Sequence, residues 1–294
     1  MAGNADRPVD LHTHTTASDG SDAPERLVRL AAERGIAAIA ITDHDTVAGI
    51  AEAGQAASRF GVELITGVEI SAEPPERVRE ARGVVHVLGY LIDLRSERLT
   101  QALAWMQERR TARNPEIIRK LNELGIDLTL DEVSVHAQGG QIGRLHVAQA
   151  LVEKGVANTV QEAFDQYLRS GGPAAVEKGK LSPSDAIEAI SAAGGIAVLA
   201  HPHQLGVGDG DALEETTCEL VEWGLGGIES RYTGHSPEQT ERYREIAARY
   251  GLAETGGSDY HGGTNPEVPL GLIPPVPYLV VDRLRERCTA GRTV

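Results

Sequence analysis

Short apolar runs alternate with segments of helical spacing along the first third of the chain. Four of these runs have the length of buried strands: 9–11, 36–41, 62–66 and 84–91. The residues Asp22-Ala23-Pro24-Glu25 are typical of a helix start, with Asp22 as the N-cap and Pro24 in the first turn. Gly35 and Gly61 are suited to end the first two helices. This β-α-β-α-β order favours a parallel sheet whose strands end together at one edge.

The alternation disappears between about Leu94 and Arg169, where charged helical segments take its place. One helix is expected through Trp105 and Arg113, and Pro115 predicts a break after it. Further helices are expected near 117–124, 145–154 and 160–168. We therefore predict a sheet domain interrupted by a helical insertion, with the sheet domain at 1–94 and 171–294 and the insertion at 95–170.

Strand and helix patterns return in the last third of the chain. Ser182 and Ser236 each precede a proline and predict helix N-caps. Short apolar runs predict three further strands, at 196–200, 227–229 and 252–254. The resumed alternation indicates that these strands belong to the same sheet as those of the first third.

Side chains that can bind metal ions occur where the predicted strands end. His12 and His14 point the same way, because alternate side chains of a strand lie on the same face. Imidazole and carboxylate groups are the ligands that Zn, Mn and Fe prefer. The whole set at the strand ends is His12, His14, Asp19, His44, Glu69, His201, Asp259 and His261. One ion needs fewer ligands than this, and a central carboxylate such as Glu69 can bridge two ions, so the set predicts a multinuclear centre.

Taken singly, these residues have structural alternatives. Asp19 could cap a helix, Asp259 could stabilise a turn, and His201 could be a hydrogen-bonded histidine of the core. Their joint placement at the ends of successive strands favours the metal centre, because the carboxyl ends of parallel strands meet at one edge.

Composition narrows the class of protein further. The 294 residues are 41% hydrophobic but only 4% aromatic, so small aliphatic side chains must fill the core. The net charge of -15 disfavours broad binding to duplex DNA or to an anionic membrane. Cys218 and Cys288 are too few for a disulfide framework, and we expect a cytoplasmic protein. Residues 1–9 are polar and predict no signal peptide, and no stretch approaches the ~20 apolar residues of a membrane span.

Five short motifs resemble, in this order, those of the PHP (polymerase and histidinol phosphatase) family: L-H-T-H-T, T-D-H-D-T, G-V-E-I-S, A-H-P and G-S-D-Y-H-G. The resemblance covers nearly the whole chain. It implies a distorted (β/α)7 barrel, phosphoester hydrolysis and up to three divalent ions, with Mn expected before Fe or Zn. The implied ligands are His12, His14, Glu69 and Asp259 for one ion, Glu69, His86 and His201 for a second, and Asp19, His44 and His261 for a third. His86 lies within a strand, where a core histidine is the alternative.

The helical insertion is similar to that of one subgroup of the family, the stand-alone nucleotide phosphoesterases. The similar stretches are G-R-L-H-V-A-Q-A-L-V-E-K-G and E-A-F-D-Q-Y-L. The resemblance implies that Arg144 and His146 bind a substrate phosphate, although Leu145 stands where the subgroup usually has proline. A solvated helix start is the alternative for Arg144. His203 and His235 are further candidates for substrate contact.

We therefore expect a hydrolase that removes the 3'-phosphate from a 3',5'-bisphosphonucleotide. Glu69 would lie between two ions, and His201 or Asp259 would assist proton transfer, so these three are the candidate catalytic residues. One alternative is a 5'-3' exoribonuclease or phosphodiesterase acting on short RNA. A histidinol-phosphate phosphatase would need no large insertion, and a non-catalytic PHP module would have lost several ligands. The expected partner is a small nucleotide phosphate or short RNA.

Overall fold

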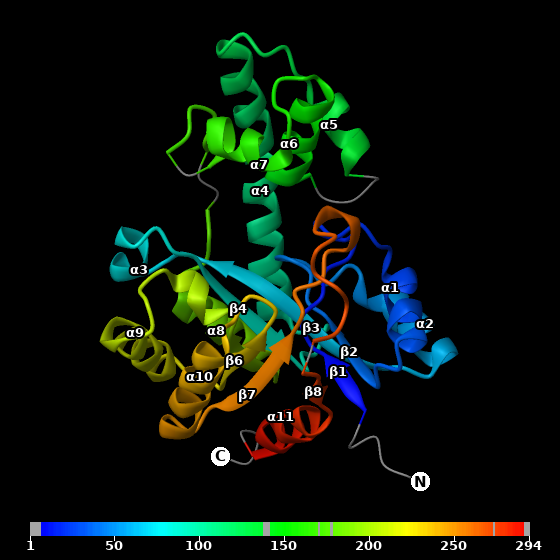
Figure 1. Cartoon of the computed structure of the whole chain (residues 1–294), viewed down its shortest axis with the longest axis vertical. Coiled ribbons are helices and arrows are strands. Elements are labelled where there is room, and N and C mark those ends of the chain that lie inside the picture. Colours follow the sequence, from blue (N-terminus) through cyan, green and yellow to red (C-terminus); the bar gives the residue numbers. More distant parts are fainter. Residues whose placement is uncertain (1–6, 138–141, 170, 177–178, 273, 291–294) are drawn as a thin grey trace. The chain divides into compact units, whose positions relative to one another are not determined.

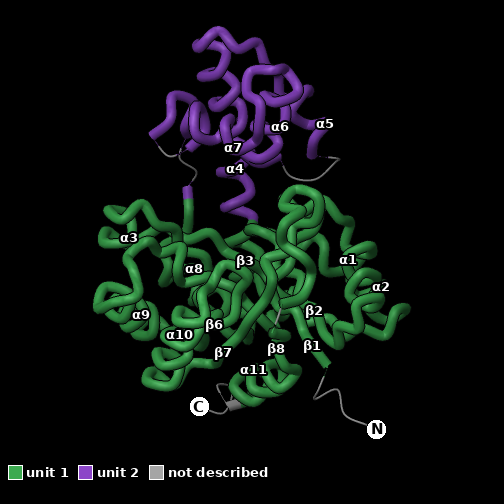
Figure 2. The backbone as a smooth tube through the Cα atoms, viewed as in Figure 1, with its two compact units in different colours: residues 1–103, 180–294 green, residues 104–179 purple. Residues whose placement is uncertain are grey.

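The computed structural model describes residues 7–137, 142–169, 171–176, 179–272 and 274–290. The chain divides into two compact units, shown in different colours in Figure 2. The first unit consists of residues 1–103 and 180–294, and the second of residues 104–179. The first unit contains the sheet, and the second contains helices.

The first unit is built on one sheet with the strand order β7-β6-β5-β4-β3-β2-β1-β8. Its strands in the described residues are β1 Pro8–Asp10, β2 Ala38–Ile41, β3 Glu63–Ala72, β4 Val85–Tyr90, β5 Ile196–Leu199, β6 Gly227–Tyr232, β7 Ala253–Gly257 and β8 Val276–Pro277. The segments after β1 and β7 meet, because Leu11 donates its N–H to the Gly256 carbonyl at 3.2 Å and Thr13 forms a parallel bridge with Tyr260. The sheet is thus nearly closed, which confirms the predicted distorted β/α barrel.

Helices surround these strands, as Figure 1 shows. Their bounds are α1 Pro24–Glu33, α2 Ile50–Phe60, α3 Glu76–Glu80, α8 Pro183–Ala192, α9 Asp211–Glu222, α10 Pro237–Arg249 and α11 Leu279–Ala290. One buried cluster joins strand residues such as Leu11 and Val198 to α11, and another joins Ile39 of β2 to Leu27 of α1 and Ala53 of α2; both consist mainly of small aliphatic side chains. This agrees with the low aromatic content, because small branched side chains fill the space between strands and helices.

The fourth strand runs against its neighbours, which corrects the expectation of a parallel sheet. β4 pairs antiparallel with both β3 and β5, and Ser71 lies opposite His86. The connection from β3 to β4 contains only the five-residue helix α3, which is too short to cross back along the sheet. The chain therefore re-enters the sheet from the edge that it has just left, and β4 begins where its neighbours end.

Two of the predicted helix N-caps are confirmed and one is wrong. Ser182 and Ser236 are N-caps whose hydroxyls accept from the backbone N–H groups of Asp185 and Gln239, as predicted. The prediction for Asp22 is wrong, because Ala23 is the N-cap of α1. Asp22 instead accepts a hydrogen bond from the Tyr260 hydroxyl at 2.7 Å, a tertiary contact that replaces the local cap.

The second unit is helical. It contains most of α4 Glu97–Glu123, together with α5 Leu130–His136, α6 Arg144–Glu153, α7 Val160–Ala163 and a π-helical turn at Phe164–Leu168. The predicted break at Pro115 is wrong, because α4 continues through this proline. Ile117 and Leu121 are fully buried beyond it and pack with Val147 and Leu151 of α6. This packing stabilises the part of α4 beyond Pro115 and compensates for the one backbone hydrogen bond that proline cannot make.

In the part of the chain that the structure describes, no helix has the length and apolar character needed to cross a bilayer.

We predict that Gly257→Ala will destabilise the first unit. A Cβ at Gly257 would overlap with the backbone nitrogen of His12, where β7 lies against the start of the barrel. We expect a loss of about 1–3 kcal/mol in the free energy of unfolding, measured by urea titration. The matched control is Gly54→Ala in α2, where a Cβ would meet only Leu64 Cδ2 at 3.7 Å. It should gain roughly 0.5–1 kcal/mol, because alanine loses less conformational freedom on folding. Equal effects of the two substitutions would contradict this view of the β1–β7 closure.

Candidate metal centre

The structure brings together all nine residues that were predicted as metal ligands. Their ligand atoms form four overlapping groups within 4.8 Å: His14, Asp19, His44 and His261; His12, Glu69 and His201; His12, His14 and Asp259; and His44, Glu69 and His86. Four residues each belong to two of these groups: His12, His14, His44 and Glu69. The cluster lies at the edge of the sheet where β1, β2, β3, β5 and β7 end.

Glu69 lies at the middle of this cluster and is fully buried. Its Oε1 lies 3.0 Å from His201 Nε2 and 2.9 Å from His86 Nδ1. Its Oε2 lies 2.8 Å from His44 Nδ1 and 3.3 Å from His14 Nε2. The two oxygens of one carboxylate therefore face two different pairs of imidazoles, as a bridging ligand requires.

The reversed direction of β4 explains how His86 reaches the cluster. His86 is the second residue of β4, and its register places it opposite Ser71, near the end of β3. In a parallel strand this position would lie at the other edge of the sheet. The sequence left a core histidine as the alternative, and the structure places His86 half-buried beside Glu69 and His201 instead.

Two aspartates complete the cluster. Asp259 Oδ1 lies 3.1 Å from His14 Nε2 and 3.4 Å from His12 Nε2. Asp19 Oδ1 lies 3.3 Å from His261 Nε2. The backbone of Asp259 has a φ of 59°, a left-handed conformation that costs energy outside glycine. Strain of this kind is typical of functional sites, where the surrounding structure holds a side chain in place.

Burial and mutual attraction determine the charges in the cluster. Burial disfavours the charged form of His14, but Asp259 and Glu69 outweigh it and raise its pKa to about 10. Burial also opposes ionisation of Glu69, yet His44, His86 and His12 hold its pKa well below the usual value. Burial lowers the pKa of His86 to about 4, so this imidazole is neutral at neutral pH. The cluster thus combines ionised Glu69 with a protonated His14 and a neutral His86 when no metal ion is bound.

Buried carboxylates outside the cluster hold the loops that carry its members. Asp10 accepts from the Ser258 N–H at 2.9 Å and from the Ser258 hydroxyl at 2.6 Å, next to Asp259. Asp43 accepts from the Thr15 N–H at 2.7 Å and from the Ser18 hydroxyl at 2.6 Å. These bonds connect loops that are far apart in the sequence, and they fix the positions of the candidate ligands.

Two residues of β6 that the sequence analysis did not predict contact the cluster. Glu229 is fully buried, and its Oε1 lies 3.0 Å from His12 Nδ1. The Tyr232 hydroxyl donates to Asp259 Oδ2 at 3.0 Å. The signal for Glu229 was a charged residue within the predicted strand 227–229, where an ionised side chain must have a buried partner.

His203 and His235, the predicted substrate contacts of the barrel, lie beside each other near this edge. Their ring centroids are 5.0 Å apart, and each also packs against Tyr232. His235 donates from Nδ1 to the Ser230 carbonyl at 3.1 Å. The structure therefore brings both histidines to the same wall as Tyr232, which contacts Asp259.

Arg144 and His146 belong to the second unit. Arg144 donates to the Leu168 carbonyl at 3.1 Å and lies over the ring of Phe164. His146 is buried, and its Nδ1 accepts from the Gly143 N–H at 3.0 Å at the start of α6. Both side chains thus have partners within their own unit.

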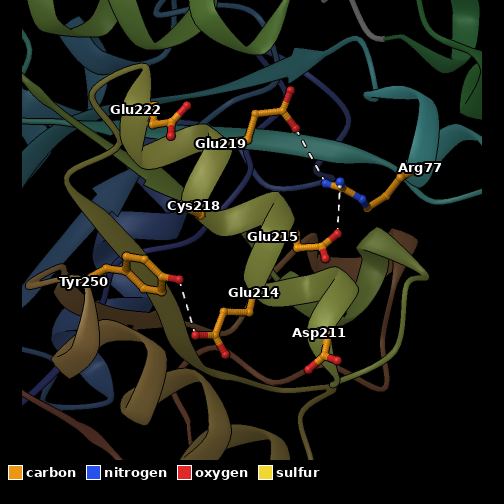
Figure 3. A pocket seen from close by; sticks show the side chains of 8 residues that line it. All are labelled: Arg77, Asp211, Glu214, Glu215, Cys218, Glu219, Glu222 and Tyr250. Atoms are coloured by element: carbon orange, nitrogen blue, oxygen red, sulfur yellow. Dashed lines mark hydrogen bonds and ion pairs between the residues drawn. The ribbon is translucent and has the colours of Figure 1, made fainter.

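A separate hollow of the first unit is acidic and contains none of the candidate ligands (Figure 3). Its lining side chains are Arg77, Asp211, Glu214, Glu215, Cys218, Glu219, Glu222 and Tyr250. Figure 3 shows that Arg77 pairs with Glu215 and Glu219, while the Tyr250 hydroxyl bonds Glu214. Much of its acidic lining is therefore used in ion pairs and hydrogen bonds of the surface.

The cluster contains buried polar atoms that a metal ion would satisfy. Within the described residues, several buried atoms of the cluster make no hydrogen bond of good geometry, although most lie within ion-pair distance of an opposite charge. They are His12 Nε2, His14 Nδ1 and Nε2, His44 Nδ1, Glu69 Oε2 and His201 Nδ1. Buried polar atoms without partners are costly in a folded protein. Imidazole nitrogens and carboxylate oxygens are also the donor set that suits Mn, Fe or Zn. The residues present therefore fit divalent metal ions.

Comparisons with known proteins agree with this geometry. A family model described as PHP domain matches residues 10–177. A 5'-3' exoribonuclease from Haemophilus influenzae is 37% identical over 87% of this chain and 90% of its own length. A phosphoribosyl 1,2-cyclic phosphate 1,2-diphosphodiesterase from Eggerthella lenta is 34% identical over 86% of this chain and 94% of its own.

A further relative and a solved structure are also described as enzymes that act on phosphate esters. A 3',5'-nucleoside bisphosphate phosphatase from Chromobacterium violaceum is 34% identical over 86% of this chain and 87% of its own. A solved structure from Bifidobacterium adolescentis, described as a metal-dependent phosphoesterase, has a TM-score of 0.85 at 32% identity and covers 96% of each chain. Because the family model matches more than half of the residues and the relatives align over most of their length, this chain belongs to the PHP domain family.

Proposed function

We propose that this protein is a metal-dependent phosphoesterase that removes the 3'-phosphate from a 3',5'-bisphosphonucleotide. The observation that carries the proposal is the position of Glu69, whose two oxygens each face a separate pair of imidazoles. A shared carboxylate of this kind is what a pair of neighbouring divalent ions requires. When bound, such ions lower the pKa of a water molecule and neutralise charge on phosphoryl oxygens.

The residues of the cluster have distinct roles in this proposal. His12, His14, Glu69 and Asp259 would hold one ion, Glu69, His86 and His201 a second, and Asp19, His44 and His261 a third. Manganese is the metal that we propose, with iron or zinc as alternatives, since imidazole and carboxylate ligands accept all three. His201 and Asp259 are the candidates for proton transfer to the leaving oxygen. His201 Nε2 lies 3.0 Å from Glu69 Oε1, and Asp259 Oδ1 lies 3.1 Å from His14 Nε2. Tyr232 orients Asp259 through its hydroxyl group.

The substrate class rests on the relatives. Their names describe a bisphosphonucleotide, a cyclic phosphate of ribose and the end of an RNA chain, all of which are phosphate esters of a ribose-containing molecule. We propose a small nucleotide substrate and a cytoplasmic enzyme. The second candidate function is a 5'-3' exoribonuclease on short RNA, which the relative at 37% identity favours.

A substrate comparison tests the proposed function. We expect the manganese-loaded protein to release inorganic phosphate from 3',5'-bisphosphoadenosine faster than it releases mononucleotides from a short 5'-phosphorylated RNA. The measurement is kcat/KM for both substrates in one buffer. A higher value on RNA would support the exoribonuclease, and no hydrolysis of either would remove the proposal.

The purified protein should bind more than one equivalent of manganese and should release protons as it does so. His14 has its pKa raised to about 10 in the metal-free protein, and a metal ion binds only the neutral imidazole. The affinity for Mn²⁺ should therefore rise between about pH 6 and pH 9. Elemental analysis gives the stoichiometry, and calorimetry in buffers of different ionisation enthalpy gives the proton count. One equivalent or fewer, bound without proton release, would contradict a multinuclear centre.

Glu69→Gln should lower hydrolysis by roughly two orders of magnitude or more, because it weakens two metal positions at once. The loss should appear in kcat, together with a lower metal content per folded molecule. The matched control is Glu219→Gln in the acidic hollow, which leaves the cluster intact and should keep normal activity. A Glu69→Gln protein with full metal content and normal kcat would show that Glu69 bridges nothing.

Arg144 and His146 remain predictions of the sequence pattern as ligands of a second substrate phosphate. A guanidinium group can bind a phosphate through two parallel hydrogen bonds, which an ammonium group cannot copy. Arg144→Lys should therefore lower kcat/KM on 3',5'-bisphosphoadenosine by about tenfold or more and barely affect p-nitrophenyl phosphate, which has no second phosphate. The control is Arg119→Lys, an exposed arginine of α4 that pairs with Glu116. Equal losses on both substrates would place Arg144 at the reacting phosphate, and no loss would remove it from substrate binding.

A further inference from the structure

The fully buried Glu229 of β6 accepts hydrogen bonds from two candidate ligands at once. Its Oε1 lies 3.0 Å from His12 Nδ1, and its Oε2 accepts from the backbone N–H of His201 at 2.8 Å. These contacts join the end of β1 to the end of β5 through a side chain of the strand beside β5. Glu229 itself is absent from the four groups of ligand atoms.

Strand register brings Glu229 to this position. β6 runs parallel to β5, with Leu199 opposite Ile228. Glu229 follows one residue later, so it lies beside the turn that connects the end of β5 to His201. The backbone of His201 has a φ of 25°, outside the usual regions for a non-glycine residue. A hydrogen bond to its N–H stabilises this strained conformation and thereby the direction of its imidazole.

The contact with His12 selects the nitrogen that is available to a metal ion. A carboxylate can only accept hydrogen bonds, so His12 Nδ1 keeps its proton when it faces Glu229. The other nitrogen, Nε2, lies 3.5 Å from Glu69 Oε1 and 3.4 Å from Asp259 Oδ1. Nε2 is also one of the buried atoms without a hydrogen-bond partner among the described residues. Its lone pair therefore points into the proposed metal centre.

We propose that Glu229 is a positioning residue that fixes the Nδ1–H tautomer of His12 and the backbone of His201, and so sets the affinity of the two metal positions that these histidines serve. The inference rests on the proposed metal centre. A histidine that binds a metal through one nitrogen commonly donates from the other to a carboxylate, which fixes the ring and raises its basicity. Here one carboxylate serves two histidines that belong to two different ions.

His12 Nδ1 lies 3.0 Å from Glu229 Oε1 and 3.3 Å from Oε2, which also accepts from the His201 N–H, so an acceptor oxygen is needed at both positions to surround the two donors. In Glu229→Gln, the amide oxygen can accept from the His201 N–H, but the amide NH2 then faces His12 Nδ1. His12 must then either lose its Nδ1 proton and carry it on Nε2, or leave two donors facing each other. If the amide turns round, its NH2 opposes the His201 N–H instead. Either arrangement disturbs one histidine of the centre without removing a ligand.

The test measures metal binding and the His12 proton separately from activity. Affinity for Mn²⁺ is measured by competition with a chelator for the wild-type protein, Glu229→Gln, Glu229→Asp and the control Glu254→Gln. Glu254 lies on β7 next to β6 and pairs with Arg244, so its substitution removes a sheet carboxylate that does not face the centre. Zinc-loaded samples with ¹⁵N-labelled histidine give the Nδ1 proton by NMR, and His12→Asn identifies its signal.

We expect Glu229→Gln to weaken Mn²⁺ binding by about 10- to 100-fold and to lose the downfield Nδ1 proton signal of His12. Glu254→Gln should match the wild type in both measurements. Glu229→Asp keeps two acceptor oxygens on a shorter arm, so it should lose less affinity than Gln. This variant also decides the matter if Gln does not fold, because its carboxylate should retain the Nδ1 proton signal while binding Mn²⁺ more weakly than the wild type.

Three results would overturn the inference. Wild-type affinity and an unchanged His12 signal in Glu229→Gln would show that Glu229 positions nothing. An Asp variant without the Nδ1 proton signal would show that the size of the side chain matters and the number of acceptors does not. A wild-type protein that binds no metal would overturn the proposed function as well, which distinguishes that failure from the first two.

Discussion

The site depends on the compensation of charges that are buried together at one edge of the barrel. Glu69 has no exposed surface, and an ionised carboxylate in such a place costs several kcal/mol without partners. His44 and His12 provide that compensation and hold the pKa of Glu69 down, while the carboxylates in turn raise the pKa of His14. Each group is therefore stable in its position only because the others are present. Such an arrangement favours binding of divalent cations, which supply the same compensation more strongly than protons do.

Rigid support for this cluster comes from carboxylates that do not belong to it. Asp10 and Asp43 hold the loops after β7 and β1 by accepting N–H and hydroxyl donors of Ser258, Thr15 and Ser18. The support is needed because the backbone at the strand ends is strained. Left-handed φ values at non-glycine residues cost roughly 1–3 kcal/mol each and persist only where surrounding bonds over-determine them. The hydrogen bonds to Asp10 and Asp43 thus stabilise loops whose backbone conformation would be unfavourable by itself.

Glu69 and Glu229 act on His12 from opposite sides of its ring. Glu229 takes up the Nδ1 side, while Glu69 and Asp259 face the Nε2 side. An imidazole between an accepting carboxylate and a metal position can present only one nitrogen to the ion. The proposed metal centre therefore includes contacts from a residue of β6 outside the five motifs, as well as from the residues that the motifs contain.

Residue type and local spacing were enough to predict the strand–helix alternation, eight of the candidate ligands and the caps at Ser182 and Ser236, while the barrel and His86 were implied by the resemblance to the PHP family. The features predicted from residue type and spacing are local, because they depend only on side-chain alternation and on the polar residues that directly follow apolar runs. Asp22 and Pro115 were predicted wrongly, because a bond to Tyr260 and the packing of α4 against α6 outweigh the local preferences.

Only the tertiary structure decided the direction of β4 and the role of Glu229. The sequence of a strand does not determine whether the strand runs parallel or antiparallel to its neighbours. That direction depends on whether the connection before the strand is long enough to return to the opposite edge of the sheet. That direction brings His86 to the metal edge. Glu229 meets His12 across 217 positions of sequence through the pairing of β5 with β6 and the closure of β7 on β1. Contacts of this kind depend on the completed barrel, because no local pattern brings the two side chains together.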